Sequence, residues 1–240
     1  MKLNVMITLA AAALLGGLTA CNSKLDEAPR ADQVPENAVR ITAGIGNPFA
    51  ATRSMPLGTE EEQGKFNVGD EIFVARKENS DIKEYAIYRF DGSVWTPKDG
   101  KYLLWVKDRI DLEAFYPAEV GLKALKGEVP DLQTDQSTKE NIAKADYMAI
   151  ELKQVKKTDQ ALNLEMKRLT SRFIVKIAGF NSEFPADAKV KNVEFHSKSN
   201  ASAPQATYTP YADGEGKAGS TYTGLVPSDA ANHTVSLTVG

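Results

Sequence analysis

The sequence contains very little cysteine and histidine, and this scarcity restricts the chemistry that the chain can perform. Cys21 is the only cysteine among 240 residues, so no disulfide can form within the chain and its stability has to come from packing. His196 and His233 are the only two histidines. Because no cluster of cysteine, histidine and carboxylate ligands accompanies them, a transition-metal site is not expected. The sequence predicts neither a metal nor another cofactor.

The sequence also lacks a large net charge and the common catalytic motifs. The formal net charge is −3, which gives no reason to expect nucleic acid as a partner. No Gly-x-Ser-x-Gly motif, phosphate-binding loop or dinucleotide-binding pattern occurs. Asp111 and Glu113 share one strand face, as a pair of acid and base carboxylates could, but a solvated polar face explains them better. We therefore assign no catalytic residue and expect a protein that is not an enzyme.

Only the N-terminus carries a long apolar run. Lys2 precedes the run Val5–Leu18, and Thr19 and Ala20 then lead to Cys21. The run is shorter than the about 20 residues of a transmembrane helix, and the arrangement is typical of a bacterial lipoprotein signal. We expect residues 1–20 to be removed as a signal peptide and Cys21 to carry diacylglycerol and a further acyl chain such as palmitate, which together anchor a protein stably. The alternative is an ordinary signal peptide followed by a fortuitous cysteine.

Beyond the signal, the sequence changes from a polar linker to an alternating strand. Residues 21–37 are polar, contain two prolines and show no apolar period, as expected of a flexible tether. A half-buried strand follows, and its predicted inward face consists of Val39, Ile41, Ala43 and Ile45. The next segment, 47–57, contains two prolines and is predicted to be an exposed loop. Arg53 lies in this loop.

The remaining sequence predicts many short strands separated by glycine, proline, asparagine and aspartate. The segment 66–75 is predicted to be a turn followed by a strand, and 139–147 a short helical turn or an irregular crossover. The other predicted strands are 85–90, 93–96, 102–106, 109–115, 162–167, 173–177, 190–196, 206–210, 220–225 and 234–239. This pattern predicts an all-β fold of sandwich type. We expect an N-terminal β-sandwich domain at 38–165 and a second one at 166–240. The second is shorter than the about 100 residues of a seven-stranded sandwich, so we interpret the chain as a fragment or its last domain as short of strands.

Taken in order, several of these features resemble a known family. They are the lipoprotein signal, the loop Ala51-Thr52-Arg53-Ser54, Phe66-x-x-Gly69-Asp70-x-Ile72-x-Val74, the Trp95 hairpin, Tyr102-x-x-Trp105 and Leu112-x-Ala114-Phe115-Tyr116-Pro117. This ordered set resembles the fimbrillin-like lipoproteins of Bacteroidetes, which are the pilin, anchor and tip subunits of type V fimbriae. The resemblance covers roughly residues 1–180 and is looser in the remainder.

The resemblance implies tandem transthyretin-like, Greek-key β-sandwich domains, the second apparently incomplete, and a fimbrial subunit at the surface of the outer membrane. A trypsin-like, arginine-specific protease would cut after Arg53 and so release the strand that contains Val39, Ile41, Ala43 and Ile45. Another fimbrial subunit would then insert a strand into the vacated groove. The resemblance also implies adhesion to host or bacterial surface ligands.

Two other functions are compatible with parts of the sequence. A glycan-binding surface lipoprotein of a nutrient-uptake system would share the lipoprotein signal and the β-sandwich. Its binding platform would use strand aromatics, which more often pack in the core; the candidates are Trp95, Tyr102, Trp105, Phe115 and Tyr116. A secreted hydrolase is the other possibility, but the sequence offers no arrangement of nucleophile and base.

Overall fold

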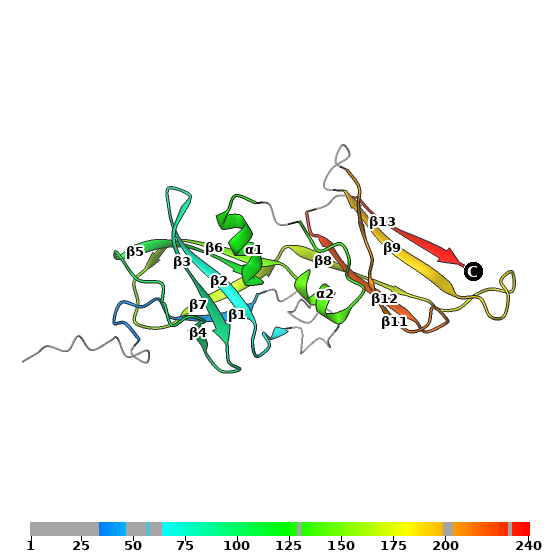
Figure 1. The fold of residues 1–240 in the computed structure, drawn as a ribbon, viewed down its shortest axis with the longest axis horizontal. Coiled ribbons are helices and arrows are strands. Elements are labelled where there is room, and N and C mark those ends of the chain that lie inside the picture. Colours follow the sequence, from blue (N-terminus) through cyan, green and yellow to red (C-terminus); the bar gives the residue numbers. More distant parts are fainter. Residues whose placement is uncertain (1–33, 47–56, 58–63, 129–130, 199–203, 230–231) are drawn as a thin grey trace, which may run out of the picture. The chain divides into compact units, whose positions relative to one another are not determined.

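We describe the protein from a computed structural model, and the described residues are 34–46, 57, 64–128, 131–198, 204–229 and 232–240. Cys21 and Arg53 lie outside the described residues, as do the expected signal peptide and most of the tether. Residues Val34–Gly240 group together as one compact unit. Figure 1 shows the arrangement of its strands and helices.

The first seven strands form one sheet, which we call the N-terminal sheet. Its strands are β1 (Ile41–Ile45), β2 (Glu71–Glu78), β3 (Asp81–Phe90), β4 (Trp95–Pro97), β5 (Arg109–Tyr116), β6 (Met148–Lys156) and β7 (Leu162–Arg168), in the order β1-β7-β6-β5-β2-β3-β4. β1 and β7 are parallel, and the other neighbouring pairs are antiparallel. Residues of β1 and β4, at the two ends of this order, lie within 8 Å of each other. The sheet therefore curls around its core.

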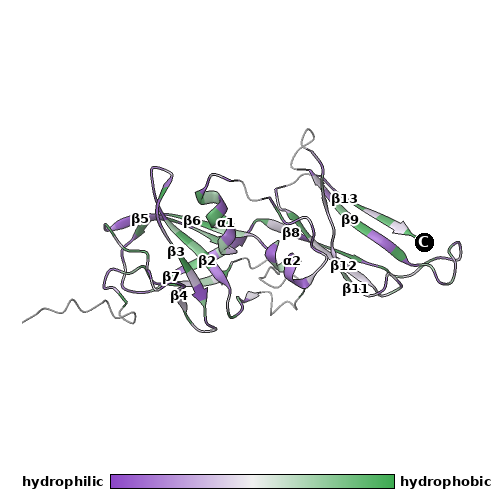
Figure 2. Ribbon diagram, in the orientation of Figure 1, coloured by the Kyte–Doolittle hydropathy of each residue, from purple (hydrophilic) through white to green (hydrophobic). Residues whose placement is uncertain are grey.

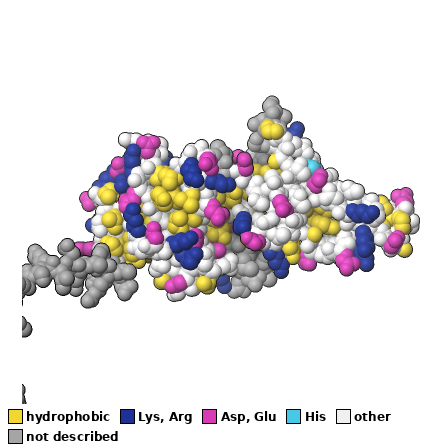
Figure 3. Space-filling model, in the orientation of Figure 1, with side chains coloured by type: hydrophobic (Ala, Val, Ile, Leu, Met, Phe, Trp, Pro, Cys, Tyr) yellow, Lys and Arg dark blue, Asp and Glu magenta, His cyan; other side chains and the backbone are white. Residues whose placement is uncertain are grey.

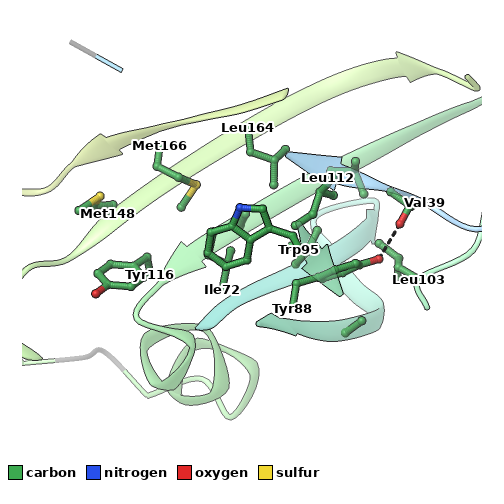
Figure 4. Close-up of a cluster of buried hydrophobic side chains, with 14 of the residues drawn as sticks. Val39, Ile72, Tyr88, Trp95, Leu103, Leu112, Tyr116, Met148, Leu164 and Met166 are labelled. Atoms are coloured by element: carbon green, nitrogen blue, oxygen red, sulfur yellow. Dashed lines mark hydrogen bonds between the residues drawn. The ribbon is translucent and has the colours of Figure 1, made fainter. Parts of the chain in front are cut away.

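Alternating apolar side chains from these strands fill the core of the N-terminal sheet. Figure 2 shows apolar and polar residues alternating along the strands, as expected for strands with one buried face. The fully enclosed core side chains include those of Val39, Ile72, Tyr88, Leu103, Ile110, Leu112, Met148, Leu164 and Met166. Figure 4 shows many of them converging from different strands. The first strand thus contributes to the same core as the rest of the sheet.

Helix α1 (Ala118–Leu125) covers part of the opposite face of this sheet. Residues 72–75 of β2 are buried without interruption, because the core lies on one side of the strand and α1 packs against Phe73 on the other. The helix approaches closely at Gly121, where an added Cβ would lie 2.3 Å from Cγ of Phe73. This continuous apolar run is the signature of a strand buried on both faces.

Two three-stranded sheets form a second structure, which we call the C-terminal sandwich. One sheet has the order β10-β9-β13, from Ala206–Tyr208, Val190–Lys198 and Asn232–Val239; the other has the order β11-β12-β8, from Tyr211–Asp213, Thr221–Pro227 and Thr170–Lys176. Their inner faces share a separate core that includes Ile177, Val190, Val193, Phe195, Tyr208, Tyr222 and Val226. β13 is an edge strand, and its Val235 and Leu237 side chains are exposed.

Helix α2 (Lys139–Lys144) precedes β6 and packs near the C-terminal sandwich. Its N-terminus is capped by Thr138, whose hydroxyl accepts a hydrogen bond of 3.1 Å from the Asn141 backbone N–H. Ile142 of α2 is fully buried and contacts the cluster that contains Leu225 of β12. Of the two alternatives predicted for 139–147, the structure has the helical turn.

The all-β fold of sandwich type is confirmed, with three differences from the predicted elements. The strand predicted at 102–106 is wrong: within the described residues, that segment forms only the isolated bridge between Ala38 and Leu104. β6, β11 and α1 were not predicted. The predicted domain limit at Met166 falls inside β7, and the sheets change at Leu169. We propose two domains that meet there.

No helix in the described part of the chain has the length and apolarity to cross a membrane. Figure 3 shows lysine and arginine side chains mixed with aspartate and glutamate over the visible face. This face has no large area of a single charge sign, such as a nucleic-acid binding surface would require.

Candidate functional site

The segment Asn37–Gly46 contains β1 and pairs with both the segment 103–105 and β7. Its surroundings form the candidate site. The inward side chains are the predicted ones: Val39 is completely buried and Ile41 is 3% exposed. Ala43 and Ile45 are partly buried and pack against the same core. The intervening Arg40 and Thr42 are exposed, as the alternation requires.

The backbone of this segment changes partners between residues 39 and 40. Before the change it pairs with the segment 103–105: the Val39 N–H donates to the Leu103 carbonyl at 2.7 Å, and the Trp105 N–H donates to the Asn37 carbonyl at 2.8 Å. After the change it pairs with β7, where the Leu162 N–H donates to the Arg40 carbonyl at 2.8 Å.

The pairing with β7 continues to the end of the segment. Ile41 is opposite Leu162, Ala43 is opposite Leu164, and Ile45 is opposite Met166. The last bond is from the Gly46 N–H to the Met166 carbonyl, at 3.0 Å. The segment therefore covers one edge of β7 along most of its length.

A buried tyrosine binds the backbone at Val39, where the pairing changes from the segment 103–105 to β7. The Tyr88 hydroxyl on β3 donates a hydrogen bond of 2.7 Å to the Val39 carbonyl, and Figure 4 shows the two groups beside Leu103. Tyr88 is completely buried. Burial raises the pKa of its hydroxyl well above its usual value, although a hydrogen bond with the Leu103 backbone acts to lower this pKa. The hydroxyl is therefore a neutral donor at physiological pH.

We name the surroundings of Asn37–Gly46 the first-strand site: the edge of β7, the segment 103–105 and Tyr88. Full burial of two side chains such as Val39 and Ile41 contributes roughly 3–6 kcal/mol. This amount is comparable with the total stability of a small domain, about 5–15 kcal/mol. If the segment left, Leu164 and Met166, which are now completely buried, would lose their cover, and the edge of β7 would lose its hydrogen-bond partners. Such an edge is a template for another strand.

Cys21 and Arg53, the two other predicted site residues, cannot be placed because they lie outside the described residues. Their positions along the chain still matter. Arg53 falls between β1 and β2, so a cut after it would separate β1 covalently from the remainder of the sheet. The hydrogen bonds and apolar contacts of the first-strand site would then be all that retains β1.

The structure does not support the aromatic platform that a glycan-binding function would use. Trp95 is 7% exposed and Trp105 is 4% exposed. The Trp95 ring packs edge-on against Phe66 and stacks on Phe90, with ring centroids 5.1 Å apart in both pairs. These aromatic side chains belong to the core.

The paired carboxylates and the histidines also have structural roles. Glu113 forms an ion pair with Lys77 at 3.0 Å, and Asp111 accepts hydrogen bonds from the backbone and side-chain amides of Gln154 at 2.7 and 3.1 Å. The His196 ring lies between hydroxyls of two neighbouring strands. Among the described residues, no group of three or more histidine, cysteine, aspartate and glutamate side chains could hold a metal ion.

A buried ion pair that the sequence does not predict lies at the end of β7. Arg168 contacts the Asp146 carboxylate through both Nε and Nη2, and the Nη2 to Oδ2 distance is 2.6 Å. Asp146 is completely buried, and burial raises the pKa of its carboxyl to about 7, although Arg168 acts in the opposite direction. No signal in the sequence joins these two residues, because the pairing depends on the register of β6 and β7, in which Arg168 is opposite Met148, two residues after Asp146.

Comparisons with solved structures found similar proteins. This chain aligns with a fimbrial protein from Bacteroides ovatus at 17% identity and a TM-score of 0.48, over 86% of this chain and 46% of that chain. It is also similar to a candidate cell adhesion protein from Bacteroides uniformis, with 12% identity and a TM-score of 0.51 over 84% of this chain and 80% of that one. The chain thus spans less than half of the Bacteroides ovatus protein. A comparison with curated proteins found no match.

The family comparison covers most of the sequence. The model of the fimbrillin-like family matches residues 53–240, which include β2–β13, the core of the C-terminal sandwich, and the N-terminal core apart from the side chains of the first strand segment. The chain therefore belongs to the fimbrillin-like family.

Proposed function

We propose that this protein is a structural or adhesive subunit of a type V fimbria, anchored at the outer-membrane surface and assembled by protease-triggered strand exchange. The observation that carries the proposal is the position of β1. Its Ile41 and the preceding Val39 close the core, yet β1 lies at one end of the strand order and precedes the segment that contains Arg53. The core therefore depends on a strand that a single cut after Arg53 could release.

The proposed sequence of events begins with an uncut monomer that its own first strand holds closed. A trypsin-like, arginine-specific protease cuts after Arg53, and β1 can then leave the first-strand site. Another subunit adds a strand to the exposed edge of β7, with apolar side chains over Leu164 and Met166. Because this contact is heterologous and does not close on itself, it propagates into a fibre.

Membership of the fimbrillin-like family supports the fimbrial role. The remaining parts of the proposal concern residues 1–20 and Cys21. We propose that the signal peptide is removed and that acylated Cys21 anchors the protein in the outer membrane before assembly. The partners are then other fimbrial subunits, the membrane, the protease and surface ligands of the host or of other bacteria.

Limited digestion tests the mechanism. We expect a trace of trypsin to cut the purified chain, expressed from Asn22 onward, first after Arg53, and we expect ladder-like oligomers to follow in size-exclusion chromatography and electrophoresis without heating. Mass spectrometry of the fragments locates the cut. An Arg53→Ala variant is the matched control and should remain monomeric. Scattered cuts elsewhere with no early cut after Arg53 would refute the mechanism, and a cut without oligomers would refute polymerisation by this chain alone.

A further inference from the structure

The Val39 carbonyl occupies a special place in the first-strand site. The Val39 N–H bonds to the segment 103–105 and the Arg40 carbonyl bonds to β7, so the Val39 carbonyl lies where the chain changes from one edge to the other. There it accepts its hydrogen bond from the Tyr88 hydroxyl, 49 residues away in sequence, at 2.7 Å. A side chain replaces a backbone partner at this point.

Tyr88 is well suited to detect an acceptor at this position. Its ring is completely buried among the core side chains, and it is held edge-on against Tyr102 with ring centroids 6.3 Å apart. The hydroxyl therefore has little freedom to turn toward another acceptor. A strand that pairs only with β7, from the level of Ile41 to that of Ile45, would not supply this carbonyl.

We infer that Tyr88 is a specificity-determining residue of the first-strand site: its hydroxyl recognises the backbone carbonyl at the Val39 position of whichever strand occupies the site. A replacing strand must then extend past the β7 edge as far as the segment 103–105. A replacing strand that only has apolar side chains at alternate positions is not sufficient. Such side chains fill the core side of the site but give the Tyr88 hydroxyl no hydrogen-bond acceptor. This inference rests on the proposed function in that the replacing strand comes from another subunit.

A double-mutant cycle on the uncut chain tests the recognition. One change is Tyr88→Phe, which removes only the hydroxyl. The other is an N-terminal deletion that makes the chain begin at Arg40 and so removes the Val39 carbonyl. Urea unfolding of the four proteins gives the unfolding equilibrium constants. We expect Tyr88→Phe to raise this constant roughly two- to twelve-fold more in the full chain than in the shortened chain, the usual net effect of one hydrogen bond, because the interaction of the hydroxyl with the Leu103 backbone is present in both.

Tyr102→Phe is the matched control. Tyr102 is a half-buried neighbour of Tyr88, and no hydrogen bond joins its hydroxyl to Asn37–Gly46 in the described structure. Its effect should be equal in the full and shortened chains. If the effect of Tyr88→Phe is also equal in the two, Tyr88 does not recognise the carbonyl and the inference is wrong.

Hydrogen exchange keeps the inference testable if the shortened chain does not fold. In the full chain, Tyr88→Phe should speed exchange of the Val39 amide by the same two- to twelve-fold and leave the Phe195 amide unchanged. Equal rates at Val39 in wild type and variant would overturn the inference. Both measurements use the uncut monomer, so they are independent of the digestion experiment. If Tyr88 recognises the carbonyl but digestion gives no oligomers, only the proposed function is refuted. If digestion gives oligomers but Tyr88 does not recognise the carbonyl, only this inference is refuted.

Discussion

Arg168 lies on β7 with its guanidinium against the Asp146 carboxylate, and both side chains are almost completely enclosed, with 7% and 0% exposure. Two buried charges are costly to desolvate, and their attraction offsets this cost only with good geometry. Here the guanidinium offers two donors, but Nη1 of Arg168 has no partner in the described structure. The pair therefore contributes less to stability than its short contacts suggest, while loss of either partner would be severe.

We expect Arg168→Met to destabilise the protein by about 3–5 kcal/mol at pH 8, because it leaves a buried carboxylate without a partner. The loss should be smaller at pH 5. Burial already raises the pKa of Asp146 to about 7, and removal of the guanidinium raises it further. A group whose pKa is higher in the folded than in the unfolded state favours folding when protonated, and this contribution is lost as the pH rises through the folded pKa. Urea unfolding at the two pH values measures the difference.

The control for this pair is the double substitution Asp146→Leu with Arg168→Met. Because it replaces both charges by apolar groups, we expect it to cost less than Arg168→Met alone and to show little dependence on pH. Equal losses for the single variant at pH 5 and pH 8 would mean that the Asp146 carboxyl does not titrate in this range.

Among the secondary-structure elements, the alternating strands were predictable and the irregular ones were not. The period of two in 39–45 and in Arg109–Tyr116 survives in the structure because each strand has one face on the core. β6 was missed because its apolar residues Ile150 and Leu152 are followed by Val155, out of phase. A register irregularity in the β5–β6 pairing and the positive φ of Gln154 cause this shift.

Within the candidate site, features set by neighbouring residues were predictable from the sequence, and features set by long-range pairing were not. The inward face of the first strand follows from local alternation, so sequence alone identified Val39 and Ile41. The edge that they cover could not be identified, because Leu162 is about 120 residues away in the chain. Tyr88 was missed for the same reason. A tyrosine in a predicted strand gives no indication of which backbone carbonyl its hydroxyl will meet.

The stabilising role of β1 can be measured on the strand itself. We expect Ile41→Ala to lower the free energy of unfolding by about 2–5 kcal/mol, the range for removal of a fully buried aliphatic side chain. Thr42→Ala on the exposed face of the same strand is the matched control and should lower it by about 1 kcal/mol or less, because it removes only the 3.4 Å hydrogen bond from an exposed hydroxyl to the Leu162 carbonyl. Urea denaturation of both variants provides the comparison. Similar losses for the two would show that β1 is not packed against the core.

At the scale of the whole molecule, two separate cores raise the question of whether the protein unfolds in one step. Leu112 belongs to the core of the N-terminal sheet and Phe195 to that of the C-terminal sandwich, and no residue is shared between these two clusters. The chain crosses between the two parts more than once: Gln136 and α2 pack against Leu225 of the C-terminal sandwich before β6, and Leu169 then joins β7 to β8. Strand exchange requires the N-terminal core to open, and separate cores allow this without unfolding of the C-terminal sandwich.

We expect two unfolding transitions that respond to different substitutions. The only two tryptophans, Trp95 and Trp105, both lie in the N-terminal core, so tryptophan fluorescence reports on that part alone, whereas circular dichroism reports on both. Leu112→Ala should cost about 2–5 kcal/mol and shift the fluorescence transition to lower urea. Phe195→Ala should cost about 3–5 kcal/mol and shift the transition of the C-terminal sandwich, which circular dichroism detects and tryptophan fluorescence does not. If Phe195→Ala shifts the fluorescence curve as much as Leu112→Ala does, the two parts unfold as one unit, and opening the first-strand site must then loosen the whole molecule.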